Sequence, residues 1–129
     1  MTLNSRAWWK YYYVYVSLSL LIYVVMFHAV PQHDYEVGNA TYYTVKSSSN
    51  ITASGERYDE EGMTCALRTH KFGHIWRVCR LDSDICVVVR NNDYGPGNQK
   101  AIIDLTPKAF SRLAPLQDGI LKVSVRRIR

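Results

Sequence analysis

The stretch between Lys10 and Asp34 contains no aspartate, glutamate, lysine or arginine, and it constrains the fold more than any other feature of the sequence. Within it, residues 11–30 read YYYVYVSLSLLIYVVMFHAV. At about 1.5 Å of rise per residue, a helix of this length spans about 30 Å, which is the thickness of the hydrocarbon core of a bilayer. We therefore predict that residues 11–30 form a transmembrane signal-anchor helix that contacts the lipid bilayer.

The residues on either side of the apolar run predict its orientation. Arg6 and Lys10 precede it, whereas Asp34 and Glu36 follow it. The positive-inside rule then places residues 1–10 in the cytoplasm and the rest of the chain on the periplasmic or extracellular side of the inner membrane. The predicted domains are a short cytoplasmic segment, the helix, a linker and one exported domain, with bounds 1–10, 11–30, 31–36 and 37–129.

Two other readings of the apolar run stay open. A cleaved signal peptide needs small residues before the cut, and Phe27-His28-Ala29 fits that need poorly. A helix buried in a soluble core is the second alternative. If the segment does cross a membrane, Ser17 and Ser19 could let it pack against partner helices and form a homo- or hetero-oligomer.

The composition outside the apolar run is that of one small globular domain. The whole chain has 129 residues, of which 47% are hydrophobic and 21% charged, and this excludes a mainly disordered chain and a large multi-domain enzyme. Arg6 and Lys10 are the only two of 16 basic residues before Pro31, and none of the 11 acidic residues precedes it, so the exported part carries +3. This mild excess suits an anionic wall polymer, and without a lysine and arginine stripe no nucleic-acid partner is expected.

Short apolar runs separated by polar loops predict a small all-β domain with one short helix. Strands are predicted at residues 37–45, 76–81, 85–90 and 121–127, and polar loops at 46–50, 52–62 and 91–100. The second and third strands flank Asp82-Ser83-Asp84 and form a predicted hairpin. Thr106 and Pro107 are typical of the start of a helix. This arrangement favours a small barrel.

Three cysteines, at positions 65, 79 and 86, leave one thiol over if a disulfide forms. Cys79 and Cys86 flank the predicted hairpin, so they are the favoured pair in an oxidising compartment. Three buried thiols that pack as small hydrophobic groups are the alternative. No Cys-x-x-Cys is present, and His70 and His74 lack the usual acidic companion, so neither a metal nor a cofactor is expected.

Five segments of the sequence carry a family resemblance. They are GNATYY (38–43), TASGERYD (52–59), TCALRTHKFGHIWRV (64–78), VVVRNNDYGP (87–96) and IIDLTPKAF (102–110). With these segments in this order, the sequence resembles the rare lipoprotein A-like and expansin-like double-psi β-barrel family, which includes septal lytic transglycosylases, over nearly all of residues 37–128. The resemblance implies a six-stranded barrel with an open polysaccharide groove.

The same resemblance implies functional acids at Asp93 and Asp104 and a groove threonine at Thr41. In a lytic transglycosylase one carboxyl group protonates the leaving oxygen while the 6-hydroxyl of the sugar attacks the anomeric carbon. We assign Asp93 as the general acid and base and Asp104 as the supporting acid. The alternatives are an Asx-turn residue at position 93 and a structural carboxylate near the helix start at position 104.

Other residues of these motifs have weaker assignments. Tyr43 and Tyr94 are predicted to present flat faces to sugar rings, with core packing as the alternative. The polar residues of TASGE are expected to brace the barrel. Two positions depart from the rare lipoprotein A pattern. Leu67 replaces the usual histidine, and leucine at this position is typical of expansin-like proteins. Tyr94 replaces the usual arginine.

The sequence therefore predicts a membrane-anchored peptidoglycan lytic transglycosylase. It would cleave the MurNAc-GlcNAc β-1,4 bond of the glycan strands and leave a 1,6-anhydromuramoyl end. Its source is bacterial or phage, and in a phage it would be a virion component that opens the wall during genome delivery or lysis. The alternative, favoured by Leu67, is a non-catalytic expansin-like module that binds or loosens cell-wall polysaccharide.

Overall fold

The computed structural model describes residues 6–28, 35–44 and 50–129 of the chain. It divides into two compact units, Met1–His33 and Asp34–Arg129. Each unit is described by itself.

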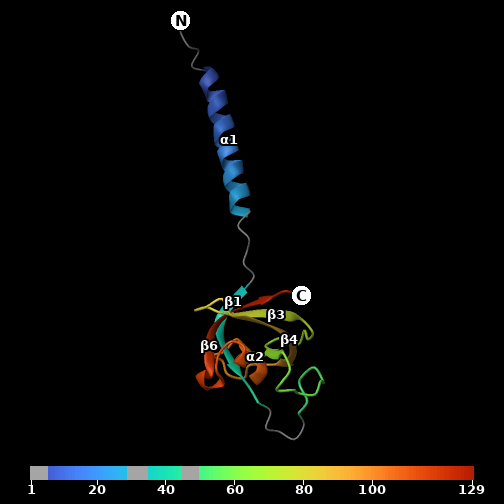
Figure 1. The fold of residues 1–129 in the computed structure, drawn as a ribbon. Helices are drawn as coiled ribbons and strands as arrows, with labels where there is room; N and C mark the ends of the chain where they lie inside the picture. Colours follow the sequence, from blue (N-terminus) through green and yellow to red (C-terminus); the bar gives the residue numbers. More distant parts are fainter. Residues whose placement is uncertain (1–5, 29–34, 45–49) are drawn as a thin grey trace. The chain divides into compact units, whose positions relative to one another are not determined.

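The first unit contains one long helix, α1, which runs from Arg6 to His28 (Figure 1). By length and composition its segment Trp8–Met26 is apolar enough to cross a membrane, and its side chains are exposed in the isolated chain. The helix begins five residues before the predicted start at Tyr11, while the predicted end at Val30 lies outside the described residues.

The hydroxyl groups of two serines in α1 hydrogen bond to backbone carbonyls of the same helix. Ser17 donates to the carbonyl of Val14 at 3.0 Å, and Ser19 donates to that of Val16 at 2.9 Å. A hydroxyl bonded to its own helix needs no partner in an apolar surrounding. These two hydroxyl groups therefore need no hydrogen-bond partner from a second helix.

The second unit is a closed barrel of six strands, with the order β1-β5-β2-β4-β3-β6. The pairs β1–β5 and β2–β4 are parallel, and the other neighbouring pairs are antiparallel. The predicted fold class, a six-stranded double-psi barrel with a short helix, is confirmed. The elements are β1 (Tyr35–Tyr42), β2 (Thr64–Leu67), β3 (Ile75–Arg80), β4 (Cys86–Tyr94), β5 (Ile103–Leu105), α2 (Pro107–Ser111), a 3-10 turn (Leu116–Asp118) and β6 (Ile120–Arg127).

Alternation along the strands fills the barrel with apolar side chains. In β6, Leu121, Val123 and Val125 are buried, whereas Lys122 and Arg126 are exposed. Successive residues of a strand point to opposite faces, so this period of two sends one set into the core.

The short helix α2 closes the core with Phe110, which is fully buried. Thr106 caps the helix and accepts from the amide of Ala109 at 3.4 Å, and its own hydroxyl donates to the carbonyl of Gly62. The predicted helix start at Thr106 and Pro107 is confirmed.

The predicted hairpin and C-terminal strand are confirmed, but the strand ends differ. The first strand begins at Tyr35, inside the predicted linker, and its predicted end at Val45 lies outside the described residues. The assignment of residues 91–94 to a loop is wrong, because β4 continues to Tyr94. These polar residues pair in parallel with β2, and that long-range pairing overrides their loop-like composition.

Cys79 and Cys86 lie opposite each other in the β3–β4 hairpin and form a disulfide, with an S–S distance of 2.04 Å. Cys65 is free and completely buried. Burial raises the pKa of the Cys65 thiol, because the thiolate would lose its hydration. Cys65 therefore acts as a small core residue rather than as a nucleophile.

Candidate active site

Four residues on adjacent strands form a row across the barrel. Thr41 of β1 lies opposite Asp104 of β5, Asp104 lies opposite Ala66 of β2, and Ala66 lies opposite Asp93 of β4. Residues directly opposite one another share a face of the sheet. With neighbouring strands about 4.8 Å apart, the Cα atoms of Asp93 and Asp104 are about 10 Å apart, with Ala66 of β2 between them in the register.

The acids of this row lie at the edge of the core. The adjacent register positions, Leu105, Cys65 and Asn91, are each 0% exposed and lie in the barrel interior. Asp93 and Asp104 are half-buried, and Ala66 between them is buried. The long-range topology thus brings two half-buried acids, eleven positions apart in sequence, to neighbouring positions of the sheet.

Three donors hold the carboxylate of Asp93. The backbone amides of Ala53 and Tyr94 both donate to its Oδ1, each at 2.8 Å. The hydroxyl of Tyr43 donates to Oδ2 at 2.9 Å. Asp93 therefore lies in strand β4 with a fixed orientation, rather than in the predicted loop.

Tyr43 is itself held by a second tyrosine. The rings of Tyr43 and Tyr58 lie 4.9 Å apart, and the Tyr58 hydroxyl donates to the Tyr43 carbonyl. Burial, and then the hydrogen bond to Asp93, raise the pKa of Tyr43 above its ordinary value. Burial also raises the pKa of Tyr58 to about 12, helped by charges that include Asp93. Both phenols therefore stay neutral over the working range of pH.

The TASGE segment braces β4 beside Asp93, as the sequence predicted. Thr52 closes its turn by donating from its amide to the Glu56 carbonyl at 2.8 Å. Glu56 then forms a bidentate pair with Arg90, at 2.6 and 2.8 Å, and accepts from Asn92 at 3.1 Å. The hydrogen bonds from Arg90 and then Asn92 lower the pKa of Glu56 to about 2, so it stays ionised.

Asp104 has a different environment. The hydroxyl of Thr41 hydrogen bonds to its Oδ1. Burial raises the pKa of Asp104 above its ordinary value, while the Thr41 hydrogen bond and the Arg68 charge act in the opposite direction. Among the described residues, the hydrogen-bond partner of the Asp104 side chain is thus the hydroxyl of Thr41. The alternative role, a structural carboxylate near the start of α2, would instead use a backbone amide of that helix.

The segment from Gly95 to Ala101 packs against this end of the row. A Cβ on Gly95 would lie 3.3 Å from the Cβ of Ala66, which is a tight contact, and 3.9 Å from Oδ2 of Asp104, which is an ordinary one. Arg68 holds the segment by donating to the carbonyls of Pro96, Asn98 and Ala101, at 3.2, 2.8 and 2.9 Å.

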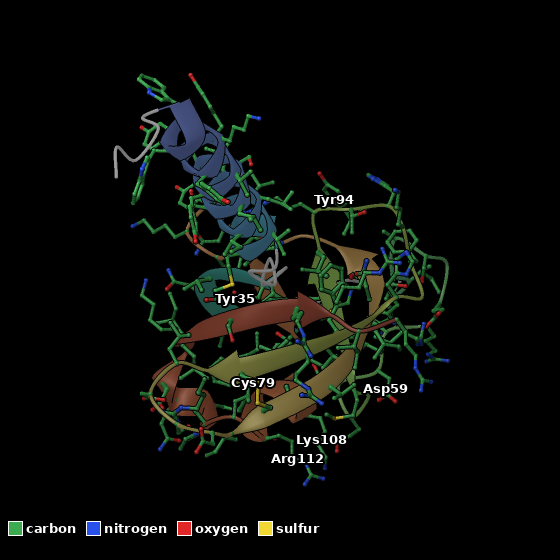
Figure 2. The ribbon with its side chains drawn as sticks, turned by 90° about the horizontal axis from the view of Figure 1, so that it is seen from above. Tyr35, Asp59, Cys79, Tyr94, Lys108 and Arg112 are labelled. Atoms are coloured by element: carbon green, nitrogen blue, oxygen red, sulfur yellow. A yellow bond between two sulfur atoms is a disulfide. The ribbon has the colours of Figure 1, made fainter. Side chains whose placement is uncertain are left out.

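Tyr94 lies at the rim of the barrel, well away from Cys79 in the view of Figure 2. Its side chain is 50% exposed, and the imidazole of His70 stacks near it with 4.5 Å between ring centroids. An exposed aromatic face next to Asp93 is compatible with contact to a sugar ring, whereas the Tyr43 ring is packed against Tyr58.

The structure brings Thr41, Asp93 and Asp104 together, and it joins Tyr43 to Asp93 through its hydroxyl rather than through an open ring face. Sequence reasoning missed Tyr58 and the Ala53 amide, although both lie in the recognised TASGERYD segment. It also missed Arg68. Leu67, at the position of the family histidine, belongs to the hydrophobic core.

The closed barrel with this strand order is that of a double-psi β-barrel protein. A family model described as lytic transglycolase matches residues 35–125, and the chain belongs to this family.

Named relatives are similar to the barrel part. The endolytic peptidoglycan transglycosylase RlpA of Pseudomonas aeruginosa is 39% identical over 92 residues, which cover 71% of this chain and 27% of the relative. A probable RlpA of Treponema pallidum is 37% identical over 90 residues, which cover 70% of this chain and 28% of the relative. The chain thus matches about a quarter of each relative's length.

Solved structures share the fold. Streptomyces papain inhibitor superposes with a TM-score of 0.62 at 24% identity, over 78% of this chain and 99% of that chain. Clavibacter michiganensis expansin in complex with cellohexaose gives a TM-score of 0.58 at 20% identity, over 74% of this chain and 50% of that chain. At these identities the likeness concerns the fold alone.

Proposed function

We propose that this chain is a membrane-anchored lytic transglycosylase that cleaves the MurNAc-GlcNAc β-1,4 bond of peptidoglycan. The row of half-buried Asp93 and Asp104 on either side of Ala66, in a member of the lytic transglycolase family, carries the proposal. The row offers two carboxyl groups with Ala66 between them in the register. A glycan strand laid across it would place a glycosidic oxygen within reach of an acid.

The reaction needs one proton to reach the leaving oxygen and another to leave the attacking hydroxyl. The C1–O4 bond breaks, and its electron pair stays on the protonated oxygen of GlcNAc. The 6-hydroxyl oxygen of the same MurNAc bonds to C1 and gives up its proton, which yields the 1,6-anhydro end. Asp93 and Asp104 supply and accept these protons, while Thr41 and the exposed face of Tyr94 bind the strand.

The proposed location is the outer side of a bacterial inner membrane. Helix α1 is long and apolar enough to anchor the chain, and the charges around it favour a cytoplasmic segment 1–10. The disulfide between Cys79 and Cys86 supports an oxidising compartment for the barrel. The relatives named above are bacterial, which favours a bacterial wall over a virion setting.

Digestion of purified sacculi by the full chain in non-ionic detergent tests the proposal. Mass spectrometry should detect 1,6-anhydromuramoyl products, and Asp93→Asn and Asp104→Asn should each reduce their rate at least about 100-fold, the usual effect of losing an acid or base. Asp84→Asn, at an exposed hairpin position, is the matched control and should keep full activity. Absence of anhydro products from the wild type, or full activity in both site variants, would refute the proposal.

A second candidate is a non-catalytic wall-binding module of the expansin type, and Leu67 favours it. Its side chain packs in the core, so this position offers the groove no titratable group in place of the family histidine. Sedimentation of the chain with sacculi, without release of anhydro products, would support this candidate over the enzyme.

A further inference from the structure

Two arginines lie directly opposite each other on the outer wall of the barrel. Arg77 of β3 pairs with Arg126 of β6, and both side chains are exposed. Like charges in such a cross-strand pair repel each other and destabilise a sheet. No carboxylate among the described residues forms an ion pair with either arginine. The fold therefore keeps two adjacent cations that an anion from outside the barrel can neutralise.

The register extends this pair into a larger surface. Tyr35 of β1 lies beside Arg126, and Val88 of β4 lies beside Arg77, so the four side chains form one outward row. Figure 2 shows these strands side by side, with Tyr35 and Cys79 labelled on them. Two more outward residues of β1 and β6 flank the row. We call this surface the basic face, and it comprises Tyr35, Val37, Arg77, Val88, Lys122 and Arg126.

Two acids near the basic face do not neutralise it. Glu36 lies in β1, but successive residues of a strand point to opposite faces, so its side chain is directed away from the face of its neighbours. Asp82, in the turn after β3, is already bound by Arg80 at 2.6 Å. Arg127 and Arg129 are exposed at the end of β6 and add positive charge beside the face.

The apolar members of the basic face favour a lipid headgroup region over a hydrated polymer. Tyr35, Val37 and Val88 are 49%, 52% and 45% exposed. Tyrosine and arginine both join an apolar part to a polar end, and such side chains suit the interface of a membrane. Basic residues next to a membrane are attracted to its anionic lipids. Exposed valines also gain by leaving water there, whereas a hydrated wall polymer offers them no apolar surroundings.

We infer that the basic face docks on the anionic lipid headgroups of the membrane that holds α1. This inference rests on the membrane anchor of the proposed function. Helix α1 ends at His28 and β1 begins at Tyr35, so seven residue steps join them. Fully extended, a chain of that length reaches at most about 25 Å. A tether this short keeps the barrel close to the bilayer, and it gives even a weakly binding face a high effective concentration.

Docking through the basic face would set the direction in which the acid row points. In the closed order of strands, β3 lies opposite β5, and β6 lies opposite β2. Asp104 is on β5, and its neighbour Ala66 is on β2. With β3 and β6 on the lipid, the side of the barrel that carries Asp104 would be turned away from the bilayer and toward the wall.

Methyl NMR of the full chain in lipid nanodiscs tests the inference, with a gadolinium chelate on some of the headgroups. In nanodiscs that contain phosphatidylglycerol, the signals of Val37 and Val88 should lose most of their intensity, and in phosphatidylcholine alone they should keep it. Ile51 is the reference, because it is 57% exposed and pairs with Arg57 outside the basic face. Salt at about 1 M shortens the Debye length to about 3 Å and should restore the signals. Equal signals in the two lipids, or an equal loss at Ile51, would overturn the inference.

Arg77→Gln with Arg126→Gln removes the paired charges and should abolish the effect of phosphatidylglycerol. Lys108→Gln with Arg112→Gln is the matched control, because it removes the same charge at α2, well away from Tyr35 in Figure 2. Unchanged signals of the buried Val78 and Val123 verify that both variants fold. An undiminished effect in the first variant, or an equal loss in both, would overturn the inference.

Sedimentation with purified sacculi separates the lipid from a wall polymer. If the arginine variant lost its binding to sacculi and kept the effect of phosphatidylglycerol, the basic face would belong to a wall polymer and the inference would be wrong. The outcomes are also distinct from those of the proposed activity. A chain that docks and releases no anhydro products would refute the activity alone. An active chain that stays in the nanodiscs without docking would refute the inference alone.

Discussion

Glu56 contributes to the site without touching it. Its carboxylate joins Arg90 and Asn92, so it fixes the strand that carries Asp93. The side chains of Glu56 and Arg90 are 43% and 38% exposed, and solvent therefore screens much of their attraction. Its bidentate geometry and the second partner still distinguish this pair from an ordinary surface ion pair.

We expect Glu56→Gln to lower the free energy of unfolding by about 1 kcal/mol at neutral pH, after allowance for screening. The folded-state pKa of Glu56 is about 2, below its ordinary value of 4.5, so its contribution is present above about pH 4.5 and is lost as the pH falls toward 2. Urea titrations of wild type and variant at several pH values measure this difference. The more exposed Glu61→Gln is the control, and an equal loss in both variants would contradict the argument.

At this scale the sequence predicted which residues lie close together better than it predicted their contacts. Asp93, Asp104 and Thr41 were identified through the motifs they occupy, and the register places them in one row. The partner of Tyr43 was beyond prediction, because its hydroxyl reaches an acid 50 positions away. The hydrogen-bond donors to Asp93 and Asp104 also come largely from distant segments of the chain, so the sequence did not indicate them either.

In strand β1, the backbone at Gly38 packs closely against a neighbouring side chain. A Cβ added to Gly38 would lie 2.6 Å from Cγ2 of Ile102, which is partly buried against the core. We expect Gly38→Ala to cost about 1–3 kcal/mol, since Ile102 must shift inside a packed region. Gly97→Ala, where a Cβ meets nothing within 4 Å, is the control and should change stability by less than about 0.5 kcal/mol. Thermal unfolding followed by circular dichroism checks both, and equal melting temperatures would contradict the packing argument.

The β3–β4 hairpin carries the disulfide, and its effect on stability follows from the short loop that it closes. Cys79 and Cys86 are 7 positions apart. By lowering the conformational entropy of the unfolded chain, a bond that closes a loop of this length stabilises the folded protein by about 2.5 kcal/mol. Cys79→Ser with Cys86→Ser should lose about that amount in guanidinium titrations. Reductant should produce the same loss in the wild type and none in the double variant, and an insensitive wild type would argue against the bond.

The elements that could be predicted are those defined by neighbouring residues. The hairpin and β6 show their pattern locally, and the α2 cap lies within four residues. By contrast, β2 and β5 contain four and three residues, too few to show a period, and only the family resemblance implied them. The end of β4 was misread because polar residues pair there with a distant strand.

The whole molecule joins a helix of membrane-spanning length to a barrel of the lytic transglycolase family. We expect the full chain expressed in bacteria to stay in the membrane fraction after an alkaline wash, because a transmembrane α1 would bury its apolar surface in lipid. Residues 35–129 exported without α1 should appear in the soluble fraction. Release of the full chain by the wash, or its appearance as a shortened soluble species, would instead support a peripheral or cleaved segment.

The parallel pairing of β1 with β5 also determines when the chain acquires its chemistry. The contact of Thr41 with Asp104 spans 63 positions, and that of Tyr43 with Asp93 spans 50. Contacts of such long range form late and slowly, since a large loop must close before they stabilise anything. Thr41 and Tyr43 therefore reach the two acids only when the barrel has closed, and any chemistry that needs these contacts is confined to the folded barrel.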